Sequence, residues 1–402
     1  MYKTTQAVKS GRNGVRAARG IAVVNGYQVR FDSFQVEQNG FSAADSFSLT
    51  LPFFVRDQQQ GDKILANGKD FESMLVNADV LPVQLYVGYP KNPGKYTKDD
   101  LMQLMDGQMD TTEWDFDMSS GEKVILHGRN AVGKMIDTKI IEKFPNLTAS
   151  AIATQFATEH GLTPVVTPTT ELAGTYYNQQ SAVLGRETTE WDLLIFLAKQ
   201  ENFIVRVKGK QLFFGPYGTV VADAAQNTPG TVYDPDKQVY VIPYTWGYDI
   251  EHLHIERSPH AARDIEVIVI TYDRNGKARI VERALSSTQR SARIAQQVGE
   301  RAKYSVTYVI PGLTREQAQK RAQQILDELS RNQLIGSIQC AGNSDCEIDR
   351  QIEIYGVGQG LSIPYYLNKV THKFSLSDAY GLDMSFSSQI YYAQGMEGDT
   401  SG

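Results

Sequence analysis

Apolar and polar positions in the last quarter of the chain predict a strand, then an amphipathic helix. Residues 304–310 (YSVTYVI) are β-branched and aromatic, as is typical of a strand, and Pro311-Gly312 ends the run. Thr314 and Gln317 have the spacing of a capping box, so a helix is predicted from there to about residue 332. The apolar positions of this helix form one narrow stripe: Ala318, Ala322, Ile325 and Leu329.

More strand-like segments follow the helix and also open the chain. The later ones are residues 335–341, 351–355, 366–374 and 383–390. One amphipathic helix among many short strands predicts a small barrel with the helix against its wall. Near the N-terminus, Phe47, Leu49 and Leu51 alternate with polar residues, which indicates a half-buried strand. Further strands are expected at residues 28–36, 80–89, 113–117 and 122–127, and a short helix at 97–105.

The middle of the chain has a different pattern. Residues 147–160 predict a helix that Thr148 caps and Gly161 ends, and residues 187–201 predict a second one. Residues 203–214 predict a hairpin that turns at Lys208-Gly209. Strands resume at residue 239, and Asn275-Gly276 indicates a tight hairpin between residues 265–272 and 277–282.

These patterns divide the chain into five parts and predict a mainly β protein with an α/β insert. The parts are a basic N-terminal arm (1–20), a first β unit (21–130), an α+β middle module with a linker (131–238), a second β unit (239–392) and a flexible tail (393–402). With 402 residues, the chain is long enough for two or three domains, each with its own core.

Composition and charge narrow the function classes. The net charge of −6 argues against nucleic-acid binding by the whole protein. The arm at residues 1–20 carries five basic residues and no acid, and is expected to be extended or docked on an acidic neighbour. No apolar run approaches the about 20 residues that span a bilayer, and the N-terminus lacks the apolar core of a signal peptide. We therefore expect no membrane-spanning segment and synthesis in the cytoplasm. Cys340 and Cys346 flank a turn-rich pentapeptide and are expected to be two reduced thiols.

One segment partly matches the sequence motif of a phosphate-binding loop. Residues 128–134 (GRNAVGK) fit the first seven positions of G-x-x-x-x-G-K-[ST] and follow a strand. Met135 stands where the Mg²⁺-binding hydroxyl should be, and no good helix is expected to start there. A linker leaving the first β unit is therefore favoured over a nucleotide site.

The remaining candidates are better explained by structure than by chemistry. His252 and His254 would share one face of a strand, with His260 near by, but no carboxylate has a metal-ligand spacing to them. His372 is expected to be a half-buried or hydrogen-bonding group in a strand. Acidic clusters occur at Asp99-Asp100, Asp115/Asp117 and Glu187/Glu190/Asp192, two of them at expected helix starts. No G-x-S-x-G or H-E-x-x-H motif occurs, so no catalytic, cofactor-binding or metal-binding residue is assigned.

Four segments together resemble a known family. They are His127-Gly128-Arg129-Asn130 at a strand end, the helix at 147–162, the helix and hairpin from Glu190-Trp191-Asp192 to Phe214, and Pro311-Gly312-Leu313-Thr314 with its helix and residues 366–374. Their order resembles the baseplate (tail) hub proteins of contractile-tailed bacteriophages, of the late-control D type. The same fold occurs in the hub part of type VI secretion spike proteins. Asn130 stands where the family has Asp.

The resemblance implies two tail-tube-like β-barrels, each with a flanking helix, and a small α+β middle module. It also implies a homotrimeric ring in the virion that adapts the sixfold tail tube to a threefold central spike and gives DNA a conduit. Its partners would be the tail-tube protein, other baseplate proteins and a separate spike protein, because no β-helical repeat or lysozyme-like region follows in this sequence. DNA would be only passing cargo, and an acidic lumen would repel it. The alternative is a cell-wall or polysaccharide-degrading or -binding module of a phage tail, and the weakest alternative is a nucleotide-binding motor part.

Overall fold

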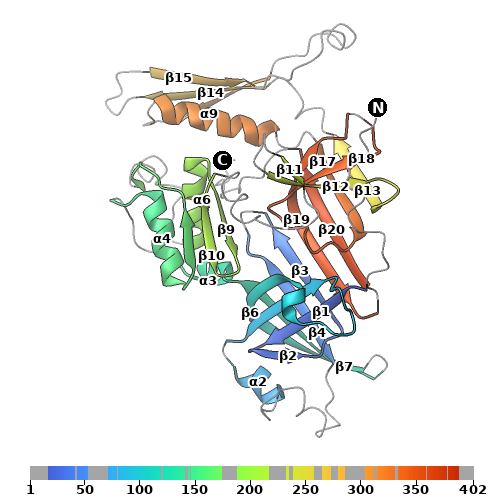
Figure 1. Ribbon diagram of the computed structural model, residues 1–402. Coiled ribbons are helices and arrows are strands. Elements are labelled where there is room, and N and C mark those ends of the chain that lie inside the picture. Colours follow the sequence, from blue (N-terminus) through green and yellow to red (C-terminus); the bar gives the residue numbers. More distant parts are fainter. Residues whose placement is uncertain are drawn as a thin grey trace.

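Strands dominate the computed structural model, in which two β units share one large sheet (Figure 1). The structure describes residues 17–40, 43–52, 71–78, 80–118, 121–140, 144, 146–173, 188–216, 232–234, 239–257, 265–272, 279–285, 304–310, 313, 315–330, 334–358, 360–377 and 379–388. Most of the predicted basic arm, the tail 393–402, the Asn275-Gly276 turn, Thr314, His260 and Glu187 lie outside these residues.

The first β unit encloses its own apolar core. It comprises β1 (Arg19–Val24), β2 (Tyr27–Val29), β3 (Ser33–Asn39), β4 (Ser46–Pro52), α2 (Phe71–Asn77), β5 (Pro82–Gly88), η2 (Lys98–Asp100), β6 (Met102–Asp117) and β7 (Gly121–Asn130). In β4 buried and partly exposed residues alternate strictly, which confirms the half-buried strand predicted from Phe47, Leu49 and Leu51. The core also contains Phe374 and Tyr380, which come from the far end of the chain.

The prediction of a helix at residues 97–105 is confirmed for its first turn and is wrong for the residues that follow. Thr97 and Asp100 do form the capping box, with Thr97 N donating to Asp100 Oδ2 over 2.9 Å. Only the three residues of η2 are helical, however, because the chain then enters the long strand β6 and pairs with β5 and β7.

The second β unit is joined to the first through β19. It comprises β11 (Val232–Asp234), β12 (Val239–Thr245), β13 (Ile250–Arg257), β17 (Leu334–Ala341), β18 (Gln351–Tyr355), β19 (Pro364–Ser375) and β20 (Ala379–Ser387). The first residues of β19 pair with β18, whereas residues 369–375 pair with β3, so one 14-stranded sheet runs through both units. The division into domains at fixed residues remains a prediction.

Within that sheet, eight strands form one continuous antiparallel path. Its order is β6-β7-β4-β3-β19-β20-β17-β13, and each neighbouring pair is antiparallel. One face of the path carries core residues of both units, including Leu49, Val36, Val370 and Ile338.

The middle module is a compact α+β unit. It contains α3 (Val132–Asp137), α4 (Ala149–Glu159), β8 (Thr163–Val166), α6 (Glu190–Glu201), β9 (Ile204–Lys208) and β10 (Gln211–Gly215) around one core. Thr148 caps α4 by accepting from Ala151 N, and Gly161 follows with a φ of +68°, as predicted. The hairpin β9–β10 confirms the turn expected near Lys208-Gly209.

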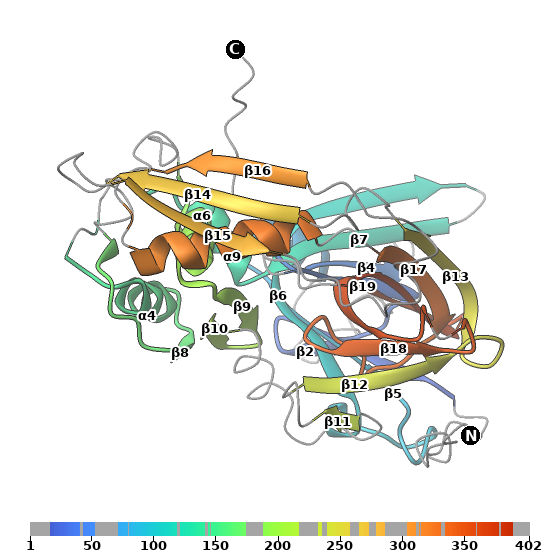
Figure 2. The same cartoon turned by 90° about the horizontal axis from the view of Figure 1, so that it is seen from above.

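The amphipathic helix lies elsewhere than predicted. Helix α9 (Arg315–Ser330) packs on a separate sheet made of β15 (Arg279–Leu285), β14 (Ile265–Tyr272) and β16 (Tyr304–Val309), as Figure 2 shows. The stripe of Ala318, Ala322 and Ile325 is buried there with Val267 and Val269. The mainly β class is thus confirmed, but this helix does not lie on the β17–β20 strands.

Candidate functional site

The path of eight strands has a polar face opposite its core. The registers place on this one face the side chains of Glu113, Asp115, Lys123, His127, Ser46, Ser48, Gln35, Glu37, Lys369, Lys373, Asp383, Ser385, Ser337, Gln339, His254 and His252. This set is called the polar face below. It crosses both β units without a break, because β19 joins them.

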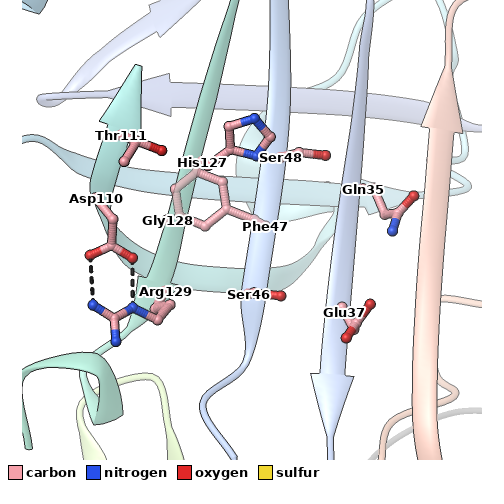
Figure 3. Close-up of a pocket in the computed structure, with 10 residues that line it drawn as sticks. All are labelled: Gln35, Glu37, Ser46, Phe47, Ser48, Asp110, Thr111, His127, Gly128 and Arg129. Atoms are coloured by element: carbon pink, nitrogen blue, oxygen red, sulfur yellow. Dashed lines mark hydrogen bonds and ion pairs between the residues drawn. The ribbon is translucent and has the colours of Figure 1, made fainter. Parts of the chain in front are cut away.

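An open groove of about 430 Å³ lies on the first-unit half of this face (Figure 3). Its lining comes from β3, β4, β6 and β7: Gln35, Glu37, Ser46, Phe47, Ser48, Asp110, Thr111, His127, Gly128 and Arg129.

Charged side chains in and around the groove are paired with opposite charges. Arg129 Nε lies 2.7 Å from Asp110 Oδ2, and Lys369 Nζ lies 2.7 Å from Glu37 Oε1. His127 Nε2 lies 3.6 Å from Glu113 Oε2. Further along the polar face, Lys123 pairs with Asp115 at 3.4 Å, and Lys373 pairs with Asp383 at 2.5 Å. The surface is therefore hydrophilic, while Arg129 and the three lysines named here already have carboxylate partners.

The Gly-Arg-Asn segment at the end of β7 is a structural junction. A side chain at Gly128 would meet Gln108 O at 2.1 Å and the Phe47 ring at 2.6 Å, so only glycine fits between β4 and β6. Arg129 also reaches α3, with Nη2 2.8 Å from Asp137 Oδ2. Hydrogen bonds from Arg129 to Asp110 and Asp137 raise the pKa of the guanidinium further above its ordinary range.

This geometry excludes a phosphate-binding loop at residues 128–134. Gly128 lies within the sheet, opposite Phe47 on one side and Met109 on the other. A short helix, α3, does begin at Val132, contrary to the expectation that none starts there. It has only six residues, and its Gly133 packs on the Arg129 side chain rather than facing an open cradle.

The other candidates from the sequence have structural surroundings. His252 and His254 are exposed on one face of β13, as predicted. His372 is buried, its Nδ1 lies 2.7 Å from Tyr380 Oη, and burial lowers its pKa to about 3, so the ring is neutral. Asp192 closes the capping box of α6 with Thr189, and Glu190 lies 2.5 Å from His160. Cys340 and Cys346 are buried and form no disulfide, in line with the expectation of two reduced thiols. Among the described residues, no cluster of His, Cys, Asp and Glu could hold a metal ion.

A largely buried group of charges, which the sequence analysis missed, joins the middle module to both β units. We call it the junction cluster: Asp45, Arg206, Lys208, Glu347, Asp349 and Arg350. Arg206 Nη1 of β9 lies 2.7 Å from Asp349 Oδ2, and Lys208 pairs with Glu347. Arg350 Nε lies 3.6 Å from Asp349 Oδ1, and both residues have no exposed surface.

The first β unit contributes the remaining contacts to the junction cluster. Asp45 Oδ1 accepts a hydrogen bond from Asn39 N at 2.9 Å, and its Oδ2 accepts one from Asn130 Nδ2 at 3.2 Å. Gln38 Oε1 accepts from Ile348 N at 3.1 Å, across 310 positions of sequence. Three parts of the chain therefore meet at this cluster.

Burial acts differently on the two aspartates of this cluster. For Asp45, burial raises the pKa from its ordinary 3.8 to about 6, although Arg206 opposes the shift. For Asp349, burial would also raise the pKa, but Arg206, Lys208 and Arg350 hold it below its ordinary value. At neutral pH both carboxylates are therefore ionised, Asp349 firmly and Asp45 with little margin.

We expect the raised pKa of Asp45 to give the protein an unusual pH dependence. Between about pH 6 and 3.8 the folded chain binds a proton here that the unfolded chain does not, so acidification stabilises the fold. Asp349 contributes little in this window, because its folded pKa is below 3.8.

The measurement compares the wild type with Asp45→Asn by urea unfolding at pH 7.5 and 4.5. As the pH falls from 7.5 to 4.5, the free energy of unfolding of the wild type, relative to that of the variant, should rise by about 2 kcal/mol. Titrations common to both proteins cancel in this difference. A constant difference between the two proteins would contradict the assignment.

Comparisons with known proteins agree with the fold described here. No protein-family model and no curated protein matches the sequence. Among solved structures, a tail protein from Neisseria meningitidis MC58 matches with a TM-score of 0.60 and 13% identity, over 92% of this chain and 96% of that one. The 43 kDa tail protein of prophage MuSo2 from Shewanella oneidensis matches with the same TM-score and identity, over 92% and 98%. This chain has the fold of phage tail proteins.

A third match extends this tail-protein fold to secretion systems. The E. coli protein c3393, described as a type VI secretion component similar to T4 tail proteins gp27 and gp5, matches with a TM-score of 0.50 and 10% identity. The match covers 93% of this chain and 79% of c3393. The resemblance inferred from four short sequence segments is thus confirmed at the level of the fold. The described part of the chain holds no helix long and apolar enough to cross a membrane.

Proposed function

We propose that this protein is a structural baseplate hub of a contractile phage tail. Three copies would form a ring that adapts the sixfold tail tube to the threefold central spike and leaves a conduit for DNA. The ring would belong to the virion and assemble in the host cytoplasm. Its partners would be the tail tube, other baseplate proteins and a separate spike, and it would catalyse no reaction.

The observation that carries this proposal is the eight-strand path through both β units. Two similar units in one chain make six in a trimer, which is what an adapter between sixfold and threefold symmetry requires. The path gives these units a shared wall, apolar on one side and polar on the other. The likeness to phage tail proteins over more than nine-tenths of the chain supports the same proposal.

The polar face suits a conduit for DNA. A basic wall would hold the phosphates by releasing counterions, and passage would stall. On this face Lys369, Lys373 and Lys123 each have a carboxylate within 3.4 Å. Such a wall stays hydrated without presenting unpaired positive charge that would bind phosphate.

The test is the assembly state of the purified chain. Light scattering over a concentration series should give the mass of a trimer, and electron-microscope class averages should show a ring with six similar lobes and a central hole. A compact monomer at every concentration would contradict a self-assembling ring. A wall-degrading activity abolished by Glu37→Gln, a groove carboxylate, would instead favour the cell-wall module.

A further inference from the structure

The eight-strand path ends in two edges that no described strand covers. β5 pairs with β6 only at residues 102–108, so residues 110–117 of β6 pair with β7 alone. At the other end, β13 pairs with β17 alone. Each of these two stretches, 110–117 and 250–257, has 8 residues, and the two lie at opposite ends of the eight-strand path. Long open edges of this kind invite pairing with another chain.

The two edges share one arrangement of side chains: polar residues lie on the polar face, and apolar residues lie on the core side. On the polar face, β6 presents Glu113 and Asp115, and β13 presents His252 and His254. On the core side, β6 presents Trp114 and Phe116, which are 38% and 60% exposed. The core side of β13 carries Leu253 and Ile255, packed at the margin of the second core. Acids would therefore meet histidines on one face, and aromatic side chains would meet aliphatic ones on the other.

The directions of the two edges also match. Every neighbouring pair along the path is antiparallel, and the path has an even number of strands, so β6 and β13 run in opposite directions. In a ring around a rotation axis, β6 of one copy would meet β13 of the next as an antiparallel neighbour. The alternation would continue without a break around the ring.

We infer that the partner for the β6 edge is β13 of a second copy of this chain. Antiparallel pairing with Glu113 opposite His254 also places Trp114 beside Leu253 and Asp115 beside His252. This contact is heterologous, which means that it closes into a ring when the rotation between copies allows it. The inference rests on the proposed hub function and names the strands that would form its subunit contact. The polar faces of the copies would then join into one continuous lumen wall.

Paired cysteines on the two edges test this contact directly. In the double variant Glu113→Cys/His254→Cys, every interface would carry one pair within disulfide reach, because directly opposed Cβ atoms lie about 4.5–5.5 Å apart. Asp115→Cys/His254→Cys probes the register shifted by two residues that keeps the same faces together. The control is Thr112→Cys/His254→Cys, in which the neighbouring residue of β6 points to the opposite face. The native Cys340 and Cys346 are buried and should not interfere.

After mild oxidation, one of the two test pairs should give covalent trimers on a non-reducing gel, and the control should give monomers. A trimer by light scattering without covalent product from either pair would overturn the β6–β13 contact and leave the ring proposal standing. Covalent ladders beyond three subunits would support the contact but contradict the closed trimer. Covalent product from the control would show that the polar faces of neighbouring copies do not lie on the same side of the contact, and would overturn the proposed pairing.

Discussion

Replacing Arg206 with Met is expected to lower the free energy of unfolding by about 3 kcal/mol, the low end for breaking a buried ion pair. Arg206 is 7% exposed, and its partner Asp349 is fully buried. The variant would leave Asp349 with Lys208 at 3.7 Å and Arg350 at 3.6 Å as its remaining cations. Those longer contacts explain why the expected loss is not larger.

Two variants make the Arg206 prediction specific. Arg315→Met removes an arginine that is also 2.7 Å from a carboxylate, Glu282, but is 81% exposed, so it should lower the free energy of unfolding far less than Arg206→Met does. The double variant Arg206→Met/Asp349→Leu removes both buried charges and should recover much of the loss. Equal effects of Arg206→Met and Arg315→Met in urea unfolding would show that burial does not govern the pair.

The junction cluster also shows why the sequence predicted some features and missed others. Helix α4 follows from signals within a few residues, Thr148 before it and Gly161 after it. The segment from Cys346 to Ile352 is wholly buried, yet its acids and arginine are typical of a surface turn. Its charges become core residues only because β9 brings Arg206 and Lys208 to them, 139 positions away for the Lys208–Glu347 pair. No local sequence pattern predicts that contact.

Helix α9 illustrates a second limit of local patterns. The stripe through Ala318, Ala322 and Ile325 correctly indicated a helix with one buried face. A stripe does not say which sheet covers it, and here β14 and β15 supply the partners. The polar face could likewise not be predicted from the sequence, because it becomes continuous only when β19 from the chain's end pairs with β3 from its start.

Replacing Phe374 with Ala is expected to cost about 3–5 kcal/mol, as for other buried phenylalanines. Phe374 belongs to β19, but its ring lies in the core of the first β unit, with centroids 5.4 Å from Phe34 and 5.9 Å from Phe31. The substitution would leave a cavity at the point where β19 joins β3. It should therefore weaken the contact between the two units as well as the core itself.

Leu376→Ala is the matched control, because this residue lies two positions further along and is 70% exposed. Its effect on the free energy of unfolding should stay within about 0.5 kcal/mol. Amide hydrogen exchange adds the local measurement: Phe374→Ala should speed exchange in both β3 and residues 369–375 of β19. If exchange rose in β3 alone, the two units would be held together elsewhere, for example by the junction cluster and by the hydrogen bond from Tyr89 Oη to Gly342 O.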